Sequence, residues 1–438
     1  MAGRCAGGEV RGARVGGRIG GVLAAVVLCA GTVRAQERDG GVADAGTDTY
    51  AQLELFARVL SYVENNYVDE VDSRALIHGA LRGMVDTLDP HTVYMPPELF
   101  RELKADSAGE FGGLGLELAR KDDALVVVAP LDDSPAARAG VMPGDVLVAI
   151  DGESTQGMDV SRAAQRLRGR TGEKVRLGLM RQGFSGPREF VLVRDIIRVA
   201  ALEARLYGHT GHVRIRNFHE RTDAQLQRAL ERLRAENGGE PLAGLVLDLR
   251  NNPGGLLDQA VAVADRFLAG GLTVVTTRGR GSKPQATYRS RERDTEPPYP
   301  MVVLVNAGSA SASEIVAGAL QDHHRAVVMG AQTFGKGSVQ TLIELQDGSG
   351  LKLTVSRYYT PSGRSIQEHG ITPDYALGGE AGGTREKDLR RHFPGEQATA
   401  ALDGGTAQAM PPGLKRSPVF DAVEDPVLRT ALEYLQGR

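Results

Sequence analysis

Three polar residues in one stretch of the chain could act together in nucleophilic catalysis. Ser311 follows the apolar run 301–305 and a short turn, and the apolar residues after it recur at helical spacing. Lys336 lies in a loop between two glycines, and Gln340 follows in a segment that alternates like a strand. A serine hydroxyl is a weak nucleophile, but a neutral lysine can accept its proton when burial lowers the pKa of the amine. The stretch is therefore suited to a serine–lysine pair.

The same residues also have ordinary structural interpretations. Ser311 stands three residues before Glu314, which is the spacing of a helix capping box, so it could serve only as a helix N-cap. Lys336 could be a solvated loop lysine, and Gln340 a polar residue of an edge strand. Because side chains alternate along a strand, Lys336 and Gln340 should share one face, which would place the Gln340 amide near the Lys336 ammonium.

The two motifs that contain these residues resemble a known signature. Asn-Ala-Gly-Ser-Ala-Ser-Ala-Ser-Glu, followed by Phe-Gly-Lys-Gly-Ser-Val-Gln, is similar to the signature of the carboxy-terminal processing proteases, a family of serine endopeptidases with a serine–lysine dyad. The resemblance implies that Ser311 is the nucleophile, Lys336 its general base and Gln340 the residue that holds the lysine in place. Ser309 and Ser313 are rival nucleophiles that spacing alone does not exclude. The family motif favours Ser311 because it places the reactive serine between two alanines.

A glycine-rich turn earlier in the chain could supply an oxyanion hole. A buried strand ends in Asp-Leu-Arg-Asn-Asn-Pro-Gly-Gly, and a helix follows. Glycines at such a turn leave backbone N–H groups exposed, as an oxyanion hole requires, although the same turn could bind phosphate or nothing. This run also resembles a motif of the family, which implies that the N–H of Gly254 or Gly255 forms the hole with that of Ala312. We interpret Asp248 and Arg250 as structural.

The first 35 residues have the pattern of a secretory signal peptide. Four arginines precede a short apolar run, and Val-Arg-Ala offers a small-residue cleavage site before Gln36. The apolar run is too short to span a membrane comfortably, so we favour cleavage over a retained membrane anchor. Both cysteines, Cys5 and Cys29, lie in this segment, so the mature chain can use neither a disulfide nor a thiol nucleophile. We predict a signal peptide over 1–35, a linker over 36–50, and export, most simply to a bacterial periplasm.

Two regions precede the catalytic motifs. Residues 51–108 carry helical apolar stripes and resemble the amino-terminal helical region of the same family, in which we interpret His91 as structural. Residues 109–195 resemble a PDZ domain, whose glycine-rich loop offers backbone N–H groups to the carboxylate of a peptide's C-terminus. The resemblance assigns peptide binding to Arg168, through which the PDZ domain is thought to communicate with the active site, and to four loop residues. The four residues are Gly113, Leu114, Gly115 and Leu116. The alternatives are a tight strand entry for the glycines and a solvated position for Arg168.

The rest of the chain predicts the core and a tail. Residues 196–377 alternate between strands and helices, which indicates an α/β fold. The resemblance adds a crotonase-like arrangement with the PDZ domain inserted into the protease, and it assigns residues 360–367 to a wall of the substrate channel. Residues 378–438 are rich in Gly, Ala, Thr and charge up to Pro418, so we predict a flexible tail that ends in a helix over 426–435.

Composition and histidine spacing argue against several other functions. The net charge of −3 gives no reason to expect nucleic acid or a strongly anionic surface as a partner. His209, His212 and His219 could suggest a metal site, but strand alternation separates the first two, and no cysteine joins them. We therefore predict neither a metal nor a cofactor.

Together, the motifs predict an exported serine endopeptidase that recognises apolar protein C-termini through its PDZ domain and cleaves peptide bonds nearby. Its partners would be protein substrates of that kind, and the interpretation leaves room for an adaptor protein and for a homo-oligomer. A trypsin-like protease is disfavoured because the chain has no Gly-Asn-Ser-Gly-Gly motif. The main alternative is a non-catalytic PDZ-containing binding or scaffold protein on the same fold, against which the joint presence of Ser311, Lys336 and Gln340 argues.

Overall fold

The computed structural model describes most of the chain after the predicted signal peptide. The chain divides into two compact units, residues 1–73 and residues 74–438. The predicted signal peptide lies outside the described residues, as does the predicted linker up to residue 44. The described ranges are 45–121, 123–131, 133–281, 284–291, 295–378, 384–395, 407–410 and 416–437.

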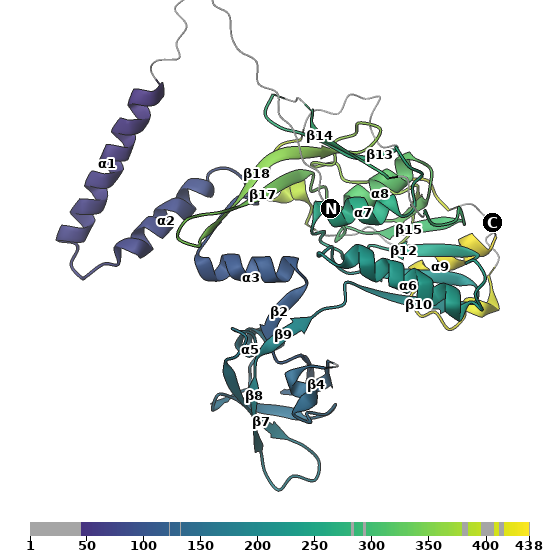
Figure 1. Cartoon of the computed structure of the whole chain (residues 1–438), viewed down its shortest axis with the longest axis horizontal. Helices are drawn as coiled ribbons and strands as arrows, with labels where there is room; N and C mark the ends of the chain where they lie inside the picture. Colours follow the sequence, from purple (N-terminus) through teal and green to yellow (C-terminus); the bar gives the residue numbers. More distant parts are fainter. Residues whose placement is uncertain are drawn as a thin grey trace, which may run out of the picture. The chain divides into compact units, whose positions relative to one another are not determined.

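The first unit contains helix α1 (Ala45–Asn66), shown in Figure 1. The helix begins inside the segment 36–50, so the predicted linker is wrong at its end. Alanine is a strong helix former, and Asp48 in the first turn complements the positive end of the helix dipole. The apolar stripe of α1 is largely exposed, for example at Phe56 and Val59. Within the described chain, no helix combines the length and the apolar character needed to cross a bilayer.

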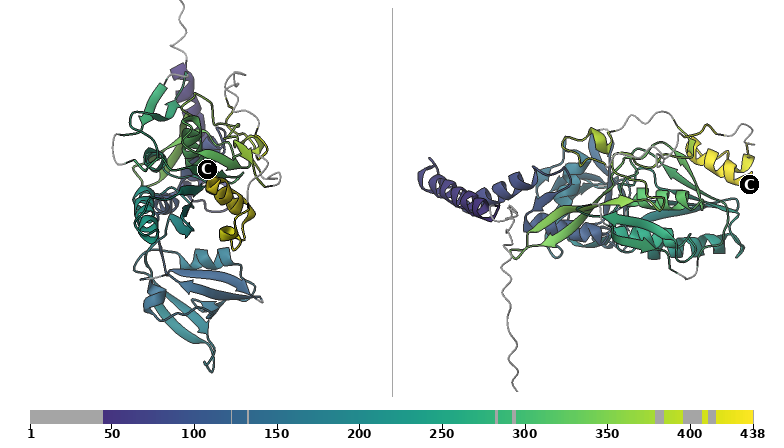
Figure 2. Two further views of the ribbon diagram at one scale, coloured as in Figure 1. Left: turned by 90° about the vertical axis from the view of Figure 1, so that its right-hand side faces the viewer. Right: turned by 90° about the horizontal axis from the view of Figure 1, so that it is seen from above.

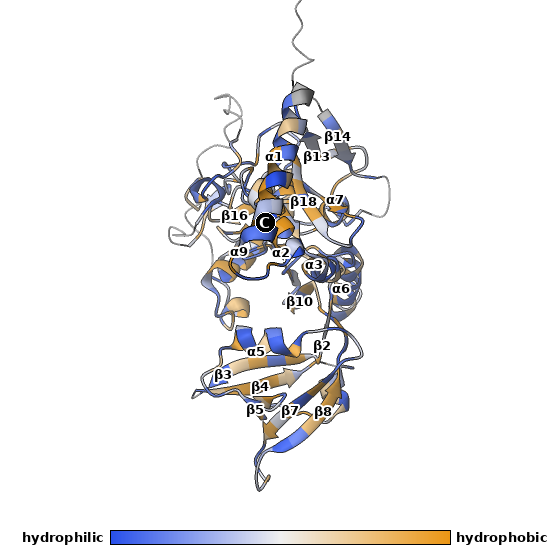
Figure 3. Ribbon diagram, turned by 90° about the vertical axis from the view of Figure 1, so that its left-hand side faces the viewer, coloured by the Kyte–Doolittle hydropathy of each residue, from blue (hydrophilic) through white to orange (hydrophobic). Residues whose placement is uncertain are grey.

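The predicted PDZ region is built on a six-stranded antiparallel sheet with strand order β3-β4-β5-β7-β8, with β6 paired to β5. Strand β3 lies at an edge of this sheet, and helix α5 contacts it. The inner strands β4 and β5 are mostly apolar, whereas α5 carries many hydrophilic positions (Figure 3). The elements are β2 (Glu110–Gly113), β3 (Leu116–Lys121), β4 (Ala124–Pro130), α4 (Pro135–Arg138), β5 (Val146–Ile150), β6 (Glu153–Ser154), α5 (Val160–Leu167), β7 (Lys174–Met180), β8 (Arg188–Val193) and β9 (Asp195–Arg198).

The core contains a second six-stranded sheet, in the order β10-β11-β12-β15-β16-β19. Only β10 is antiparallel to its neighbour among these strands. Because β12 and β15 are parallel neighbours, their carboxyl ends lie side by side. The glycine turn after β12 and the serine turn after β15 are therefore close together. The predicted α/β class is confirmed. The elements are β10 (Leu202–Tyr207), β11 (Thr210–Ile215), α6 (Thr222–Glu236), β12 (Gly244–Asp248), α7 (Leu257–Asp265), β15 (Met301–Val305), α8 (Ala312–Asp322), β16 (Val327–Gly330) and β19 (Tyr375–Ala376).

The two faces of the parallel sheet are buried against different helices. Leu247 and Val303 belong to the apolar cluster that includes residues of α6, α7 and α8. Their neighbours Val246 and Val302 belong to a cluster with residues of α9 (Pro426–Gln436), because alternate side chains point to opposite faces. Helix α9, yellow in Figure 2, contacts β12 and β15. The predicted carboxy-terminal helix is therefore confirmed, and it docks on the core.

A five-stranded antiparallel sheet carries the segment after Lys336. Its first strand in this region begins at Ser338, so Lys336 itself lies in the preceding loop. The sheet consists of β1 (Val93–Met95), β18 (Gly350–Tyr359), β13 (Thr273–Arg278), β14 (Pro284–Arg289) and β17 (Ser338–Glu344), which pairs with β18. Helices α2 (Ser73–Val85) and α3 (Pro97–Ser107) flank β1 in the sequence.

The prediction of a flexible tail over 378–438 is wrong for residues 384–395. This segment contains a short 3-10 helix, η1 (Glu386–Asp388), and the side chain of Glu386 is fully buried. The Glu386 N–H donates to the carbonyl of Phe334 over 3.1 Å, which ties the segment to the core. Composition does not reveal this order, because it depends on partners far away in the sequence.

Candidate active site

Ser311 occupies a strained turn between β15 and α8. Its φ of 55° and ψ of −113° are unusual for a residue with a side chain, and such conformations cost roughly 1–3 kcal/mol and persist where the surroundings impose them. A serine on a sharp strand-to-helix turn presents its hydroxyl above the end of the sheet, as in a nucleophile elbow. Ser311 is only partly buried, so this hydroxyl is accessible.

The two rival serines are buried and engaged in hydrogen bonds. The Ser309 hydroxyl donates to the carbonyl of Leu249 over 2.8 Å and accepts the N–H of Asn306 over 3.0 Å. The Ser313 hydroxyl donates to the carbonyl of Asn252 over 2.9 Å. Both side chains are fully inaccessible to solvent, so Ser311 is the serine of this turn that a substrate can reach.

A single buried carboxylate joins the serine turn to the lysine loop. Oε2 of Glu314 accepts the N–H of Ser311 over 2.8 Å and the N–H of Lys336 over 2.9 Å, so these two nitrogens lie within about 5.7 Å of each other. The other oxygen accepts the N–H of Gly335 and the hydroxyl of Thr333. Sequence reasoning treated Glu314 only as part of a capping box. Its spacing from Ser311 was visible, but its bonds to a loop 22 residues further on were not.

The electrostatics of the site suit a lysine that acts as a base. Burial, and then the like charge of Lys352, lower the pKa of Lys336 to about 8, although Glu386, Glu314 and Asp89 act in the opposite direction. A general base is most effective when its pKa lies near the working pH. Burial also raises the pKa of Glu314 to about 7, although its four hydrogen bonds oppose the rise.

Gln340 lies on β17, and its amide is directed to neighbours other than Lys336. Nε2 of Gln340 donates to the hydroxyl of Ser338 over 2.8 Å and, at 3.5 Å, to that of Thr354. Its predicted contact with Lys336 is not among the hydrogen bonds of the described residues. The prediction relied on strand alternation from Lys336 to Gln340, but β17 begins only at Ser338, so the alternation does not extend to Lys336.

The glycine turn after β12 packs directly against the serine turn. A Cβ atom on Gly254 would lie 2.8 Å from both the Ala310 carbonyl oxygen and the Cβ of Ser311. The N–H of Gly254 donates to the side chain of Asn252 over 2.9 Å. The N–H groups of Gly255 and Ala312, in contrast, have no acceptor within the described part of the chain. The structure thus brings all three predicted oxyanion-hole residues to one edge of the sheet.

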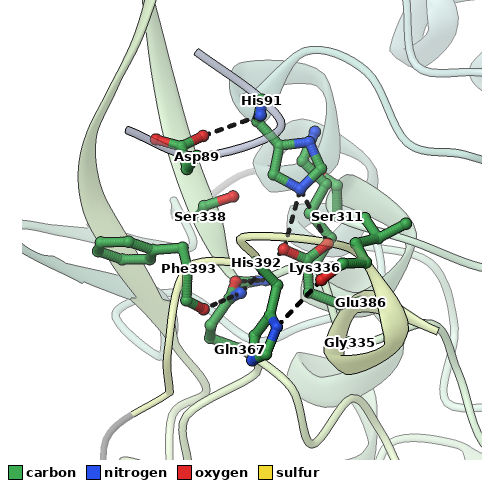
Figure 4. A network of polar contacts seen from close by, with 12 residues as sticks. Asp89, His91, Ser311, Gly335, Lys336, Ser338, Gln367, Glu386, His392 and Phe393 are labelled. Atoms are coloured by element: carbon green, nitrogen blue, oxygen red, sulfur yellow. Dashed lines mark hydrogen bonds and ion pairs between the residues drawn. The ribbon is translucent and has the colours of Figure 1, made fainter. Parts of the chain in front are cut away.

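A further polar cluster lies beside Lys336 (Figure 4), and sequence reasoning missed its role. Nε2 of His91 lies 2.9 and 2.8 Å from the two carboxylate oxygens of Glu386. Gln367 donates to Glu386 over 3.0 Å and accepts the N–H of Gly337 over 2.9 Å. The sequence analysis interpreted His91 only as structural, and no sequence signal marks Glu386.

Asp248 and Arg250 have the structural role that we predicted. Arg250 makes two hydrogen bonds to Asp248, at 2.9 and 2.6 Å, and one of 2.6 Å to Asp425 at the start of α9. Burial alone would raise the pKa of Asp248, but hydrogen bonds from Arg250 and His212 hold it well below its usual value. Arg250 therefore fastens α9 to the end of the strand that leads into the glycine turn.

The three histidines considered as metal ligands lie in different surroundings. His209 contacts Asn237 over 2.7 Å, and His212 contacts Asp248 over 3.4 Å. His219 is buried next to Gly109. In the described ranges, no group of three or more His, Cys, Asp or Glu side chains is placed to hold a metal ion.

The predicted peptide-binding loop enters the edge strand β3. Gly115 has a φ of +71°, and a Cβ atom there would lie 2.3 Å from the Cβ of Ser134, so the position requires glycine. Leu114 is buried and Leu116 begins β3, whereas Gly113 pairs with Asp195 of β9. A peptide could extend the sheet along the edge of β3, with α5 beside it.

Arg168 ends helix α5 and lines a cavity of about 620 Å³. Its guanidinium carbon lies 4.7 Å from the centroid of the Phe111 ring. The cavity is also lined by Glu98 and Glu102 of α3, and Arg170 lies 3.7 Å from Glu98. Arg168 thus lies beside Phe111, in a cavity that residues of α3 also line.

Several known proteins and family models are similar to this chain. Residues 209–377 match the model of peptidase family S41, residues 126–181 a PDZ domain, and residues 27–98 the "Activating protease CtpB N-terminal domain". The chain is 43% identical over 368 residues to a carboxy-terminal-processing protease of Bartonella bacilliformis, covering 82% of this chain and 85% of that protein. It is 39% identical over 310 residues to a carboxyl-terminal-processing protease of Synechocystis, covering 69% and 71%. The solved photosystem II D1 C-terminal processing protease aligns with a TM-score of 0.46 at 32% identity, over 75% of this chain and 93% of that one.

Proposed function

The chain belongs to the family of carboxy-terminal processing proteases, and we propose that Ser311 and Lys336 are the catalytic dyad with which it cleaves proteins near their C-termini. It is a serine-type peptidase with a PDZ domain. The observation that carries the proposal is the shared Glu314 oxygen, which holds the backbones of Ser311 and Lys336 together. The lowered pKa of Lys336, about 8, supports its role as the base.

In the proposed mechanism, the Ser311 hydroxyl attacks the carbonyl carbon of the scissile peptide bond while the neutral amine of Lys336 takes its proton. The oxygen of that carbonyl becomes negatively charged in the tetrahedral intermediate. The lysine then returns the proton to the leaving amine, and a water molecule hydrolyses the acyl-enzyme by the same steps.

The donors of the oxyanion hole are proposed to be the N–H groups of Gly255 and Ala312. Both lack an acceptor in the described chain, whereas the N–H of Gly254 already donates to Asn252. The Ala312 N–H also lies at the amino terminus of α8, where the helix dipole favours negative charge. Gly254 instead permits the close approach of the two turns.

Substrate recognition is proposed to occur along the edge of β3. Protein substrates with apolar C-termini would add a strand there, with their terminal carboxylate at the loop around Gly115. We further propose that residues 1–35 direct export to a periplasm. An adaptor protein and self-association are compatible with this function but are not needed for its chemistry.

The test is cleavage of an unstructured polypeptide with an apolar C-terminus by the wild type, Ser311→Ala and Lys336→Ala. We expect both variants to lose kcat/KM by at least about a thousandfold, as removal of a nucleophile or base does in other serine proteases. Thermal unfolding verifies that both remain folded. If Lys336→Ala cleaved like the wild type, the dyad would be wrong. If all three bound the polypeptide without cleaving it, the chain would be either an enzyme that rests without its activator or a binding or scaffold protein.

A further inference from the structure

A chain of hydrogen bonds joins Glu386 to the residue that follows the proposed general base. The Gly337 N–H donates to Oε1 of Gln367 over 2.9 Å, and Nε2 of Gln367 donates to Glu386 over 3.0 Å. Gln367 and Glu386 are both fully buried. The contact at Gly337 is close, because a Cβ atom there would lie 2.3 Å from the backbone nitrogen of Gln367. Any displacement of Glu386 or Gln367 is therefore transmitted to the backbone next to Lys336.

Glu386 also holds the other side of the lysine loop. Its own N–H donates to the carbonyl of Phe334 over 3.1 Å, two residues before Lys336. Glu386 thus contacts both ends of the loop 334–337. It bonds directly to Phe334, and it is connected to Gly337 through Gln367. Regular secondary structure begins only at Ser338, so the loop is positioned by these attachments, by Glu314 and by backbone hydrogen bonds to Ser309, Glu368 and Tyr358.

We propose that Glu386 is a positioning residue for the general base, held by His91 and acting on the lysine loop through Gln367 and Phe334. The proposal rests on the proposed role of Lys336 as the base. Neither Glu386 nor His91 lies in residues 209–377, the range that matches the peptidase family model, so this support comes from outside the family's core motif. Figure 4 shows the residues converging beside Lys336 from three separate segments.

The buried carboxylate has the partners that such a group needs. A buried charge is tolerated when it is hydrogen-bonded and paired, and His91 contacts both oxygens of Glu386. The backbone of His91 is also held, because its backbone N–H donates to the side chain of Asp89 over 2.8 Å. Asp89 also accepts the hydroxyl of Thr354 on β18 over 3.2 Å. The cluster therefore connects the turn before β1, the segment 384–395 and the lysine loop.

The charge of Glu386 also acts on the pKa of Lys336. This effect allows a positioning role to be distinguished from a purely structural one. The charged groups that act on Lys336 are Lys352 from β18, Glu386 from η1, Glu314 from α8 and Asp89 from the turn before β1. The carboxylate of Glu386 favours the protonated lysine, so its removal lowers the pKa of Lys336. The rise of kcat/KM with pH would then occur at lower pH, an effect that a loss of stability alone would not cause.

The experiment compares Glu386→Gln, Glu386→Ala and Gln367→Ala with wild type in the full chain. Glutamine can keep the hydrogen bond from Gln367 while it removes the charge, whereas alanine removes both. We expect Glu386→Ala and Gln367→Ala to lower kcat about tenfold or more with KM within about threefold, because a misplaced base affects the chemical step. Glu386→Gln should keep its plateau kcat within about threefold and shift the acid limb of the kcat/KM profile to lower pH.

The controls distinguish failure of this inference from failure of the proposed function. Lys387→Gln changes an exposed charge in the same segment and should match wild type, and Lys336→Ala reports whether the lysine is needed at all. The double variant Glu386→Ala/Gln367→Ala should be little worse than either single variant, because both act through one connection.

The inference is overturned if Lys336→Ala is inactive while Glu386→Ala has the kcat of Lys387→Gln, or if Glu386→Gln leaves the acid limb unmoved. If Glu386→Ala fails to fold, the pH profile of Glu386→Gln and the kcat of Gln367→Ala decide. An active Lys336→Ala variant would instead refute the dyad, and the inference with it.

Discussion

The serine side and the lysine side of the active site reach their geometry by different means. On the serine side, residues 301–322 form a buried strand, a turn and a helix, so the position of Ser311 follows from regular backbone structure. On the lysine side, residues 331–337 have no regular structure, and contacts from distant segments hold them. The side chains of Glu314 and Gln367 make some of these contacts, and backbone groups such as the N–H of Glu386 make others.

The two sides therefore differ in what positions them. Regular backbone structure positions Ser311, whereas contacts with distant segments position Lys336. The strained φ of Ser311 can persist because β15 and α8 are both packed in the core. Some hydrogen bonds of the lysine loop depend on a single side chain, Glu314 or Gln367, so substitution of either residue should misplace the base without unfolding the core. On the serine side, substitutions that fill the narrow space between the glycine turn and the serine turn should reduce activity most.

The largest effect is expected from Gly254→Ala, which tests the serine side. Its Cβ atom would lie 2.8 Å from the Ala310 carbonyl oxygen, so the two turns must separate. We expect kcat/KM to fall about a thousandfold, since small misplacements of reacting groups are costly. Gly271→Ala is the matched control, with a φ of +82° and no atom within 4 Å of its Cβ position. It should lose only about 1–2 kcal/mol of stability. Equal activity of the two variants would show that the close approach is unimportant.

Glu314→Gln tests the carboxylate that contacts both the serine turn and the lysine loop. All four groups that contact its carboxylate are donors, so a glutamine NH2 would face two donors without an acceptor. We expect kcat to fall about a hundredfold, with a lower melting temperature. Glu240→Gln, the same change at an exposed side chain, should affect neither. Full activity of Glu314→Gln would mean that the serine and the lysine are held together by other contacts.

The sequence predicts the motifs of the site better than the distant contacts that hold the lysine loop. Ser311, Lys336 and the glycine turn belong to short continuous motifs, and the α/β core follows from alternating apolar runs, so these were identified without a structure. Glu386 was not, because its burial depends on His91, which lies 295 residues earlier. The expected contact between Gln340 and Lys336 assumed that the strand includes Lys336, whereas β17 begins at Ser338. Short motifs and their family resemblance thus led to the proposed reacting groups, but not to the contacts that support the proposed base.

A smaller effect is expected from Lys352→Gln, which acts on the base through charge alone. The like charge of Lys352 lowers the pKa of Lys336 to about 8 together with burial, so its removal should raise that pKa. The acid limb of kcat/KM should then move to higher pH, opposite to the shift expected for Glu386→Gln. The measurement is a pH–rate profile beside Lys387→Gln. A shift in the same direction for both variants would contradict the assignment of Lys336 as the titrating base.

The smallest effects should come from the two buried serines of the nucleophile turn. Ser309→Ala and Ser313→Ala each remove a hydroxyl that donates to a backbone carbonyl, so each should cost about 1–2 kcal/mol of stability. Neither hydroxyl reaches solvent, and kcat should stay within about threefold of wild type. Denaturant unfolding and turnover are the measurements. An inactive but folded Ser309→Ala or Ser313→Ala would reopen the choice of nucleophile.

The attachment of α9 has a consequence for how the protein is made. Leu428, Leu432 and Leu435 cover the face of the parallel sheet that contains Val246 and Val302, and Asp425 binds Arg250 just before the glycine turn. Until residues 425–436 have docked, that apolar face is open to water. We expect the folding core to expose a sticky surface to other chains until α9 closes over it.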